Sequence, residues 1–202
     1  MPQDLKYRGE HTLLYLGPRC SVREGVTLSR GTAALGKTVI GSDCLFMANS
    51  HVAHDCVIGN HVIVANCTAI AGHVEVGDNV LIGGLAGIHQ FARVGKGAAI
   101  GAGAMVGQDV PPYMMAQGDR AVIRGLNLVG LKRRGAHSSD VAVIKKAYRL
   151  LFFSKLTLPE AIERLEADSP TAHIEEIIEF LRNSPRGICR PEPDAEEDAS
   201  TR

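Results

Sequence analysis

Aromatic side chains are scarce in this sequence of 202 residues, of which they form 4%, and tryptophan is absent. Proteins that bind single-stranded nucleic acid without sequence preference stack the bases on aromatic side chains, so this kind of binding site is disfavoured. Any hydrophobic core must instead be built from aliphatic and small side chains.

The sequence also has no net charge, because its positive and negative side chains balance. Lys and Arg together number 22, as do Asp and Glu, so the chain has no overall basic field to attract a phosphate backbone. Residues 191–202 are the exception, because they carry five acidic residues and one arginine. A stretch so rich in Pro, Glu and Asp buries too little apolar surface to fold. We therefore expect no nucleic-acid partner, and a disordered acidic tail over residues 191–202.

Cysteine pairs and long apolar runs are missing as well. The five cysteines are odd in number and include no Cys-x-x-Cys pair, which argues against a disulfide framework or a zinc framework and suits a reducing compartment. The longest stretch without Asp, Glu, Lys or Arg, residues 56–74, is interrupted by Asn and His. The sequence predicts no signal peptide, no membrane span and a cytoplasmic location.

Glycine, by contrast, is abundant, and 21 of the 22 glycines lie in residues 1–135. In the middle of this part every sixth residue is large and apolar, and the residue four places later is small or β-branched. The in-phase apolar residues are Ile40, Phe46, Val52, Ile58, Val64, Ile70, Val76, Ile82, Ile88, Val94, Ile100 and Val106. A period of six matches neither a helix nor a plain alternation, and it is typical of a solenoid.

Three short strands per coil explain the pattern, because an apolar residue followed by glycine recurs every 18 residues, as at Ile40 and Ile58. The prediction is a parallel β-helix of triangular section over residues 1–112, with coils about 4.8 Å apart. Residues 31–38 break the phase and are expected to leave the coil as a loop. Pro112 lacks a backbone donor and is expected to end the ladder.

The rest of the chain changes character. We expect a linker over residues 113–135, followed by a small α-helical domain over residues 136–190. Ile144, Tyr148 and Leu151 have helical spacing, and Thr157-x-x-Glu160 is a capping box. A solenoid needs covered ends, so about three helices would cap one of them.

One edge of the predicted coil gathers polar residues. Residue numbers taken modulo 18 place a set of side chains within one position of each other on consecutive coils. This set contains His54, Gly72, His73, His89 and Gln90, with His51 close by. Two chemistries use such a strip: metal hydrolysis with three His ligands, and acyl transfer with a His general base beside an oxyanion donor.

The neighbours of His54 favour acyl transfer. Asp55 follows it and would orient the imidazole, provided that the pair stands at a corner, because adjacent strand residues point to opposite faces. Gly72 lies at the same angle on the next coil and offers a backbone N–H without side-chain obstruction. Cys44 and Cys56 occupy the small position of the repeat, and we assign them to packing.

Seven ordered motifs resemble one family. They are Gln3-Asp-Leu-Lys-Tyr7, Met47-Ala-Asn-Ser-His-Val-Ala-His-Asp-Cys56, Ala71-Gly-His73, His89-Gln-Phe91, Gln108-Asp-Val-Pro-Pro-Tyr113, Ala116-Gln-Gly118 and Gly130-Leu-Lys-Arg-Arg-Gly135. From residue 2 to about residue 190, the chain resembles the acyl-carrier-protein-dependent UDP-N-acetylglucosamine O-acyltransferases. These hexapeptide-repeat enzymes start lipid A biosynthesis.

The resemblance implies a left-handed parallel β-helix that assembles as a homotrimer, with active sites between neighbouring subunits. It implies transfer of a 3-hydroxyacyl chain from acyl carrier protein to the glucosamine 3-hydroxyl of UDP-N-acetylglucosamine, with no metal and no organic cofactor. In this reading His54 is the general base, Asp55 is its partner and Gly72 is the oxyanion donor.

Further roles follow from the same resemblance. Positions that match substrate-contacting residues are His51, His73, His89 and Gln90 around the substrate and acyl groups, Asp4 and Lys6 at the sugar nucleotide, and Asn127, Arg133 and Arg134 at the uridine and phosphate end. Ala102 stands where a glycine is common at the floor of the acyl groove, so its methyl would favour a shorter chain. Val129 stands where an acidic residue is common.

One departure from the family and several alternative functions stay open. The family has further coils before the Gln3 motif, so this chain is expected to present its first strand as an uncovered edge with unpaired backbone groups. The histidine strip also fits a carbonic-anhydrase-like zinc β-helix, and the short start fits a truncated, non-catalytic trimeric paralogue. The related N-acyltransferase of the same pathway normally carries an extra N-terminal domain.

Overall fold

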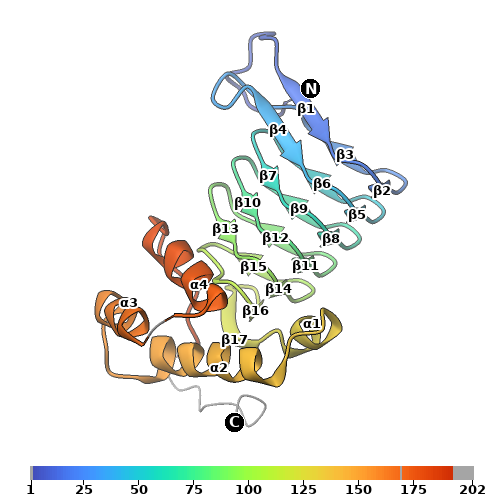
Figure 1. Cartoon of the computed structure of the whole chain (residues 1–202). Coiled ribbons are helices and arrows are strands. Elements are labelled where there is room, and N and C mark those ends of the chain that lie inside the picture. The colour runs from blue at the N-terminus through green and yellow to red at the C-terminus, as the bar shows by residue number, and fades with distance from the viewer. Residues whose placement is uncertain (1, 169, 193–202) are drawn as a thin grey trace.

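The computed structural model describes residues 2–168 and 170–192 (Figure 1). Its larger part is a prism of coils, and each coil supplies a short strand to each of three sheets. Sheet A contains β1 (Leu13–Leu16), β4 (Lys37–Ile40), β7 (Val57–Ile58), β10 (Glu75–Val76) and β13 (Arg93–Val94). Sheet C contains β3 (Thr27–Leu28), β6 (His51–Val52), β9 (Ala69–Ile70), β12 (Gly87–Ile88) and β15 (Met105–Val106).

Sheet B is the longest of the three. It contains β2 (Ser21–Val22), β5 (Leu45–Phe46), β8 (Ile63–Val64), β11 (Leu81–Ile82), β14 (Ala99–Ile100), β16 (Met114–Gln117) and β17 (Val122–Leu126). Pairing is parallel between coils, with Val52 opposite Ile70 and Ile58 opposite Val76, which is the predicted 18-residue repeat. Only β16 and β17, among the strands described, pair antiparallel.

The core fills the inside of the prism. Every in-phase apolar residue from Ile40 to Val106 is at most 3% exposed. Burial of each such aliphatic side chain stabilises the fold by about 1.5–3 kcal/mol. The predicted parallel β-helix with an α-helical C-terminal part is confirmed.

The corners of the coil share one backbone conformation. Between φ 56° and 66°, in the left-handed region, lie Asp43, Asn49, Asp55, His61, Cys67, His73, Asn79, Leu85 and Phe91, six residues apart. Asn and Asp tolerate this region better than most side chains, whereas Leu85 and Phe91 are uncommon there. A left-handed residue breaks the alternation of a strand, so side chains adjacent in sequence can meet at a corner.

The ladder does not end at Pro112 as predicted. β16 pairs with β14, and β16 and β17 both lie in the segment 113–135 expected to be a linker. The prolines fall after the bridge between Val94 and Val110, and the ladder resumes when the Tyr113 amide donates to the Lys96 carbonyl at 2.9 Å. A missing N–H ends a ladder only where a donor is needed.

The N-terminal end of the prism is uncovered. β1, β2 and β3 are the outer strands of their sheets, and the in-phase residues Leu16 and Val22 are 46% and 44% exposed. The loop between β3 and β4 spans residues 29–36, so it lies two residues earlier than the predicted excursion over residues 31–38, and Lys37 and Thr38 already belong to β4.

Four helices follow the solenoid and lie at the end opposite the N-terminus (Figure 1). They are α1 (Leu128–Arg133), α2 (Ser138–Phe153), α3 (Leu158–Ala167), which has the predicted capping box, and α4 (Ala172–Arg182). α4 is tied to the last coils, since the Arg93 guanidinium donates to the Phe180 carbonyl at 3.2 Å. No helix in the described ranges is long and apolar enough to cross a bilayer. Most of the predicted tail, from residue 193 on, lies outside the described residues.

Candidate active site

His54 and Asp55 stand at the corner that joins sheet C to sheet A. The imidazole Nδ1 lies 2.8 Å from Asp55 Oδ2, and both residues are buried. Asp55 has the left-handed backbone described above, with φ 59°, which lets two consecutive side chains meet. The corner pairing predicted from the sequence is therefore present, and it leaves Nε2 of His54 as the atom available to a substrate.

Asp55 is held by the loop that interrupts the repeat. Its carboxylate accepts hydrogen bonds from the Thr32 amide at 2.9 Å, the Thr32 hydroxyl at 2.6 Å and the Leu35 amide at 3.3 Å. Burial acts to raise the pKa of Asp55, but the hydrogen bonds from Thr32 and His54 outweigh it and the pKa is lowered. The carboxylate thus stays ionised beside His54, where it orients the imidazole and would stabilise an imidazolium.

Gly72 lies directly against the His54 ring on the next coil. A Cβ built on Gly72 would sit 2.7 Å from Cε1 and 2.8 Å from Nε2 of His54, so any side chain here would displace the imidazole. Among the described residues, no group accepts a hydrogen bond from the Gly72 amide. A base and an unoccupied N–H donor therefore lie side by side, as acyl transfer requires.

His73 completes the corner. Its Nε2 lies 3.7 Å from Asp55 Oδ2, and its ring meets the His54 ring edge-on at a centroid distance of 5.2 Å. On its other side His73 stacks on Phe91, with centroids 4.6 Å apart. Phe91 belongs to the His89-Gln-Phe91 motif but is not among the predicted site residues.

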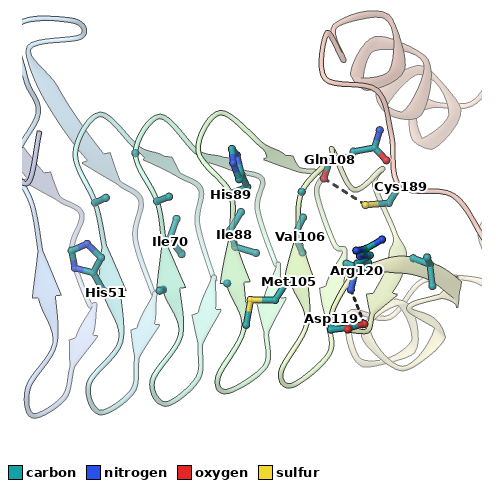
Figure 2. A pocket seen from close by; sticks show the side chains of 18 of the residues that line it. His51, Ile70, Ile88, His89, Met105, Val106, Gln108, Asp119, Arg120 and Cys189 are labelled. Carbon is teal, nitrogen blue, oxygen red and sulfur yellow. Dashed lines mark hydrogen bonds between the residues drawn. The ribbon is translucent and has the colours of Figure 1, made fainter.

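A groove of about 900 Å³ starts at this corner and runs along the outer face of sheet C (Figure 2). His51, His54, Gly72 and His89 line it, whereas His73 lies behind His54 and does not line the groove. His51 Nδ1 lies 2.6 Å from the Thr27 hydroxyl, and burial together with the nearby His54 lowers the His51 pKa.

His89 lies on the coil nearer the helices, and its Nδ1 is 2.9 Å from the Gln90 carbonyl. Gln90 itself does not line the groove. The Arg186 guanidinium, which follows α4, comes within 3.2 Å of His89 Nδ1 and donates to the Gly107 carbonyl at 3.0 Å. Arg186 was missed by sequence reasoning, because a contact across 97 residues leaves no local signal.

The remaining predicted residues lie elsewhere on the prism. Asn127 is the N-cap of α1, where it accepts from the Gly130 amide and donates to the Gly97 carbonyl, both at 2.9 Å. Arg134 donates to the Asn79 carbonyl at 3.4 Å, and burial lowers its pKa. Gly97 and Asn79 belong to the corner between sheets A and B, so this group is separate from the His54 corner.

Arg133 and Val129 belong to the same short helix and are exposed. Ala102 occupies the third corner, between β14 of sheet B and β15 of sheet C, and does not line the groove. The predicted site residues are therefore distributed over all three edges of the prism.

At the N-terminus, Asp4 closes a local turn in which its carboxylate accepts from the Lys6 amide at 3.0 Å. Neither of these two residues lines the groove, whereas the adjacent Gln3 does. The N-terminal segment thus reaches the groove through Gln3, which belongs to the same motif as Asp4 and Lys6 but is not among the predicted contacts.

Only one group of potential metal ligands is present among the described residues: His54, Asp55 and His73, whose ligand atoms lie within 4.8 Å of one another. His51 and His89 are not part of it. Asp55 Oδ2 already accepts from His54 and from the Thr32 hydroxyl, so a cation at this point would compete with both hydrogen bonds. The donor set is poorly matched to a three-histidine zinc site.

Comparison with known proteins agrees with this geometry. Residues 37–72 and 73–108 match the bacterial transferase hexapeptide model, and residues 109–189 match the second domain of UDP N-acetylglucosamine O-acyltransferase. The Myxococcus xanthus acyl-(acyl-carrier-protein)-UDP-N-acetylglucosamine O-acyltransferase is 52% identical over 191 residues, which cover 94% of this chain and 74% of the relative.

The relative of the same name from Anaeromyxobacter sp. is 49% identical over 195 residues, which cover 94% of this chain and 75% of that protein. A solved UDP-N-acetylglucosamine acyltransferase from Bacteroides fragilis superposes with a TM-score of 0.91 at 42% identity, covering 94% of this chain and 75% of that chain. By sequence, fold and the matched domains together, this chain belongs to the acyl-carrier-protein-dependent UDP-N-acetylglucosamine O-acyltransferase family.

Proposed function

We propose that this chain transfers a 3-hydroxyacyl group from acyl carrier protein to the glucosamine 3-hydroxyl of UDP-N-acetylglucosamine, the first step of lipid A biosynthesis. The family assignment supports the substrates. The observation that carries the mechanism is the contact of His54 with both Asp55 and Gly72 at the head of the sheet C groove.

In this mechanism, His54 Nε2 removes the proton from the sugar hydroxyl while the hydroxyl oxygen attacks the thioester carbonyl carbon. The carbonyl oxygen becomes an oxyanion and accepts a hydrogen bond from the Gly72 amide. Asp55 holds the proton on Nδ1 and stabilises the imidazolium. The tetrahedral intermediate then expels the thiolate of the carrier, which recovers the proton from His54, and the new ester remains on the sugar.

The substrate-binding residues on the other edges require more than one chain. Arg134 lies at a different corner of the prism from His54, and Arg133 precedes it at the end of α1, so we place these two arginines against the His54 corner of another subunit. We propose a homotrimer in which the α1 corner of one subunit faces the His54 corner of its neighbour, so that the arginine fork meets the diphosphate. Asp4 and Lys6 stay candidates for sugar contacts in that assembly, and Ala102 for the acyl groove.

Two further statements belong to the proposal. The acyl carrier protein is acidic and would be attracted by the mild basic excess of residues 1–190. The cysteines of the described residues are all free thiols, which supports a reducing, cytoplasmic location.

The experiment is steady-state acyl transfer by the parent and by His54→Ala. We expect a loss in rate of about 10²–10⁴, with the fold retained, because His54 contributes little to the hydrophobic core. Lys155→Ala is the control, since Lys155 is exposed between α2 and α3, does not line the groove and should leave the rate unchanged.

Equal rates for His54→Ala and the parent would overturn the assignment of the base. Zinc bound at one atom per subunit, with hydration of CO₂ and no acyl transfer, would instead support the zinc β-helix. Folded trimers that neither bind the sugar nucleotide nor turn over would support the non-catalytic paralogue.

A further inference from the structure

The floor of the sheet C groove is made of two rows of outward-facing residues on consecutive coils. One row is His51, Ala69, Gly87 and Met105, and the other is Ala53, Ala71, His89 and Gly107. Between the histidines the floor is apolar and the side chains are small. A chain of methylene groups would lie on such a floor without meeting an unpaired polar group.

Beyond His51, Met105 is the first large side chain along its row. A Cβ built on Gly87 would lie 2.7 Å from Met105 Sδ and 3.7 Å from its Cε, so the thioether of Met105 covers the backbone of the preceding coil. Figure 2 shows this side chain lying along the groove floor toward the coil of Ile88. Met105 is 49% exposed, which leaves its side chain accessible to a bound ligand.

Behind Met105 the groove reaches a polar wall. Asp119 and Arg120, in the turn between β16 and β17, line this end (Figure 2). Two backbone hydrogen bonds attach the turn to Met105, from the Met105 amide to Gly118 at 2.9 Å and from the Ala121 amide to Met105 at 3.0 Å. The wall is therefore attached to the strand of Met105, and a longer apolar ligand that runs toward it would have to displace the Met105 side chain.

Resting on the acyl-transfer function proposed above, we propose that Met105 sets the length of the acyl chain that this groove accepts. The reacting carbonyl lies at the coil of Gly72, and Met105 lies two coils further along, a distance of about 10 Å at the spacing of parallel strands. Within one chain this stop acts independently of Ala102, which lies at a different corner and outside the groove.

The test compares kcat/KM for a series of 3-hydroxyacyl carrier proteins that increase by two carbons. For Met105→Ala we expect the ratio of the next longer chain to the parent's best chain to rise by about tenfold or more, since each methylene accommodated in an apolar pocket changes kcat/KM by about 10–200-fold. Gly87→Ala should shift preference to shorter chains, because its methyl displaces the thioether. Val57→Ala, which changes an exposed residue of sheet A, should keep the parent's preference.

A Met105→Ala variant that keeps the parent's preference would overturn the proposal. Calorimetric binding of 3-hydroxyacyl pantetheines of the same lengths is the second readout, and it does not depend on turnover. If the parent binds them but transfers no acyl group, the acyl-transfer function fails while the length dependence of binding still decides the role of Met105. If Met105→Ala binds longer pantetheines no better than the parent does, Met105 is not the stop.

Discussion

Two corners of the same prism have the same backbone and different chemistry. Asp55 and His73 on one edge, and His61 and Asn79 on another, all have a φ near 60°. On the first edge the left-handed residue carries a carboxylate that meets the preceding imidazole, and the next coil has a glycine. On the second, the corner is covered by α1 through Asn127 and Arg134. The repeat gives every corner the same backbone conformation. The side chains at a corner, and the later elements that cover it, decide whether that corner forms a functional site.

Breaking the first corner should have the largest effect. Gly72→Ala places a methyl within 2.8 Å of the His54 ring, so the imidazole must move away from the oxyanion donor. We expect kcat to fall by about 10²–10⁴, the range for losing a positioned general base, because alanine keeps the backbone N–H and only the imidazole is displaced, with little change in thermal unfolding.

The control for Gly72→Ala is the same substitution in the His54→Ala background. If the methyl acts by displacing His54, the double variant should be hardly slower than His54→Ala alone, because the two effects share one cause. A full additional loss in the double variant would show that the methyl acts elsewhere.

Removing contacts at the second corner, which α1 covers, should lower the stability of the fold. Asn127→Ala removes the N-cap of α1 and the hydrogen bond to Gly97, and we expect the free energy of unfolding to fall by about 0.5–2 kcal/mol, measured by urea denaturation. Val129→Ala, on the exposed face of the same helix, should change it by less than about 0.5 kcal/mol. Unchanged stability for Asn127→Ala, with a raised KM for the sugar nucleotide, would instead make Asn127 purely a substrate contact.

The pH dependence of stability tests the hydrogen bonds that link the loop between β3 and β4 to Asp55 at the first corner. The lowered pKa of Asp55 means that its hydrogen bonds contribute fully above its ordinary pKa and that this contribution is lost as the pH falls through the folded-state value. Thr32→Val removes one donor and raises the folded-state pKa of Asp55, so the midpoint of acid unfolding, followed by circular dichroism, should move to higher pH.

Thr12→Val is the matched control for this shift, because the buried Thr12 hydroxyl has no hydrogen-bond partner among the described residues. Its acid-unfolding midpoint should coincide with that of the parent. An unmoved midpoint in Thr32→Val would mean that the hydrogen bond from Thr32 does not stabilise the ionised form of Asp55.

The smallest effect concerns the thiols inside the repeat. Burial raises the pKa of Cys44 to about 11 and that of Cys56 to about 12, while Cys67 is exposed at a corner. Iodoacetamide at mild alkaline pH should label Cys67 first, as mass spectrometry of peptides would show, with acyl transfer unchanged. Faster labelling of Cys56 would contradict the packing role.

Much of this molecule could be predicted from residue spacing. A coil of 18 residues is a local repeat, so it fixes which side chains enter the core and which coils bring His54, Gly72 and His73 to one edge. The end of the ladder was placed too early, because whether Pro112 interrupts it depends on the strands that pair beyond it rather than on the proline itself.

The sequence by itself determined the repeat, the apolar interior and the angular register of the histidine strip, because these follow from contacts at a constant separation along the chain. Only the tertiary structure decided that Thr32 stabilises the ionised form of Asp55, that Arg186 reaches His89 and that Met105 covers Gly87 in the groove. Those contacts depend on a loop, on a returning C-terminal segment and on side-chain packing between coils, none of which a period in the sequence encodes.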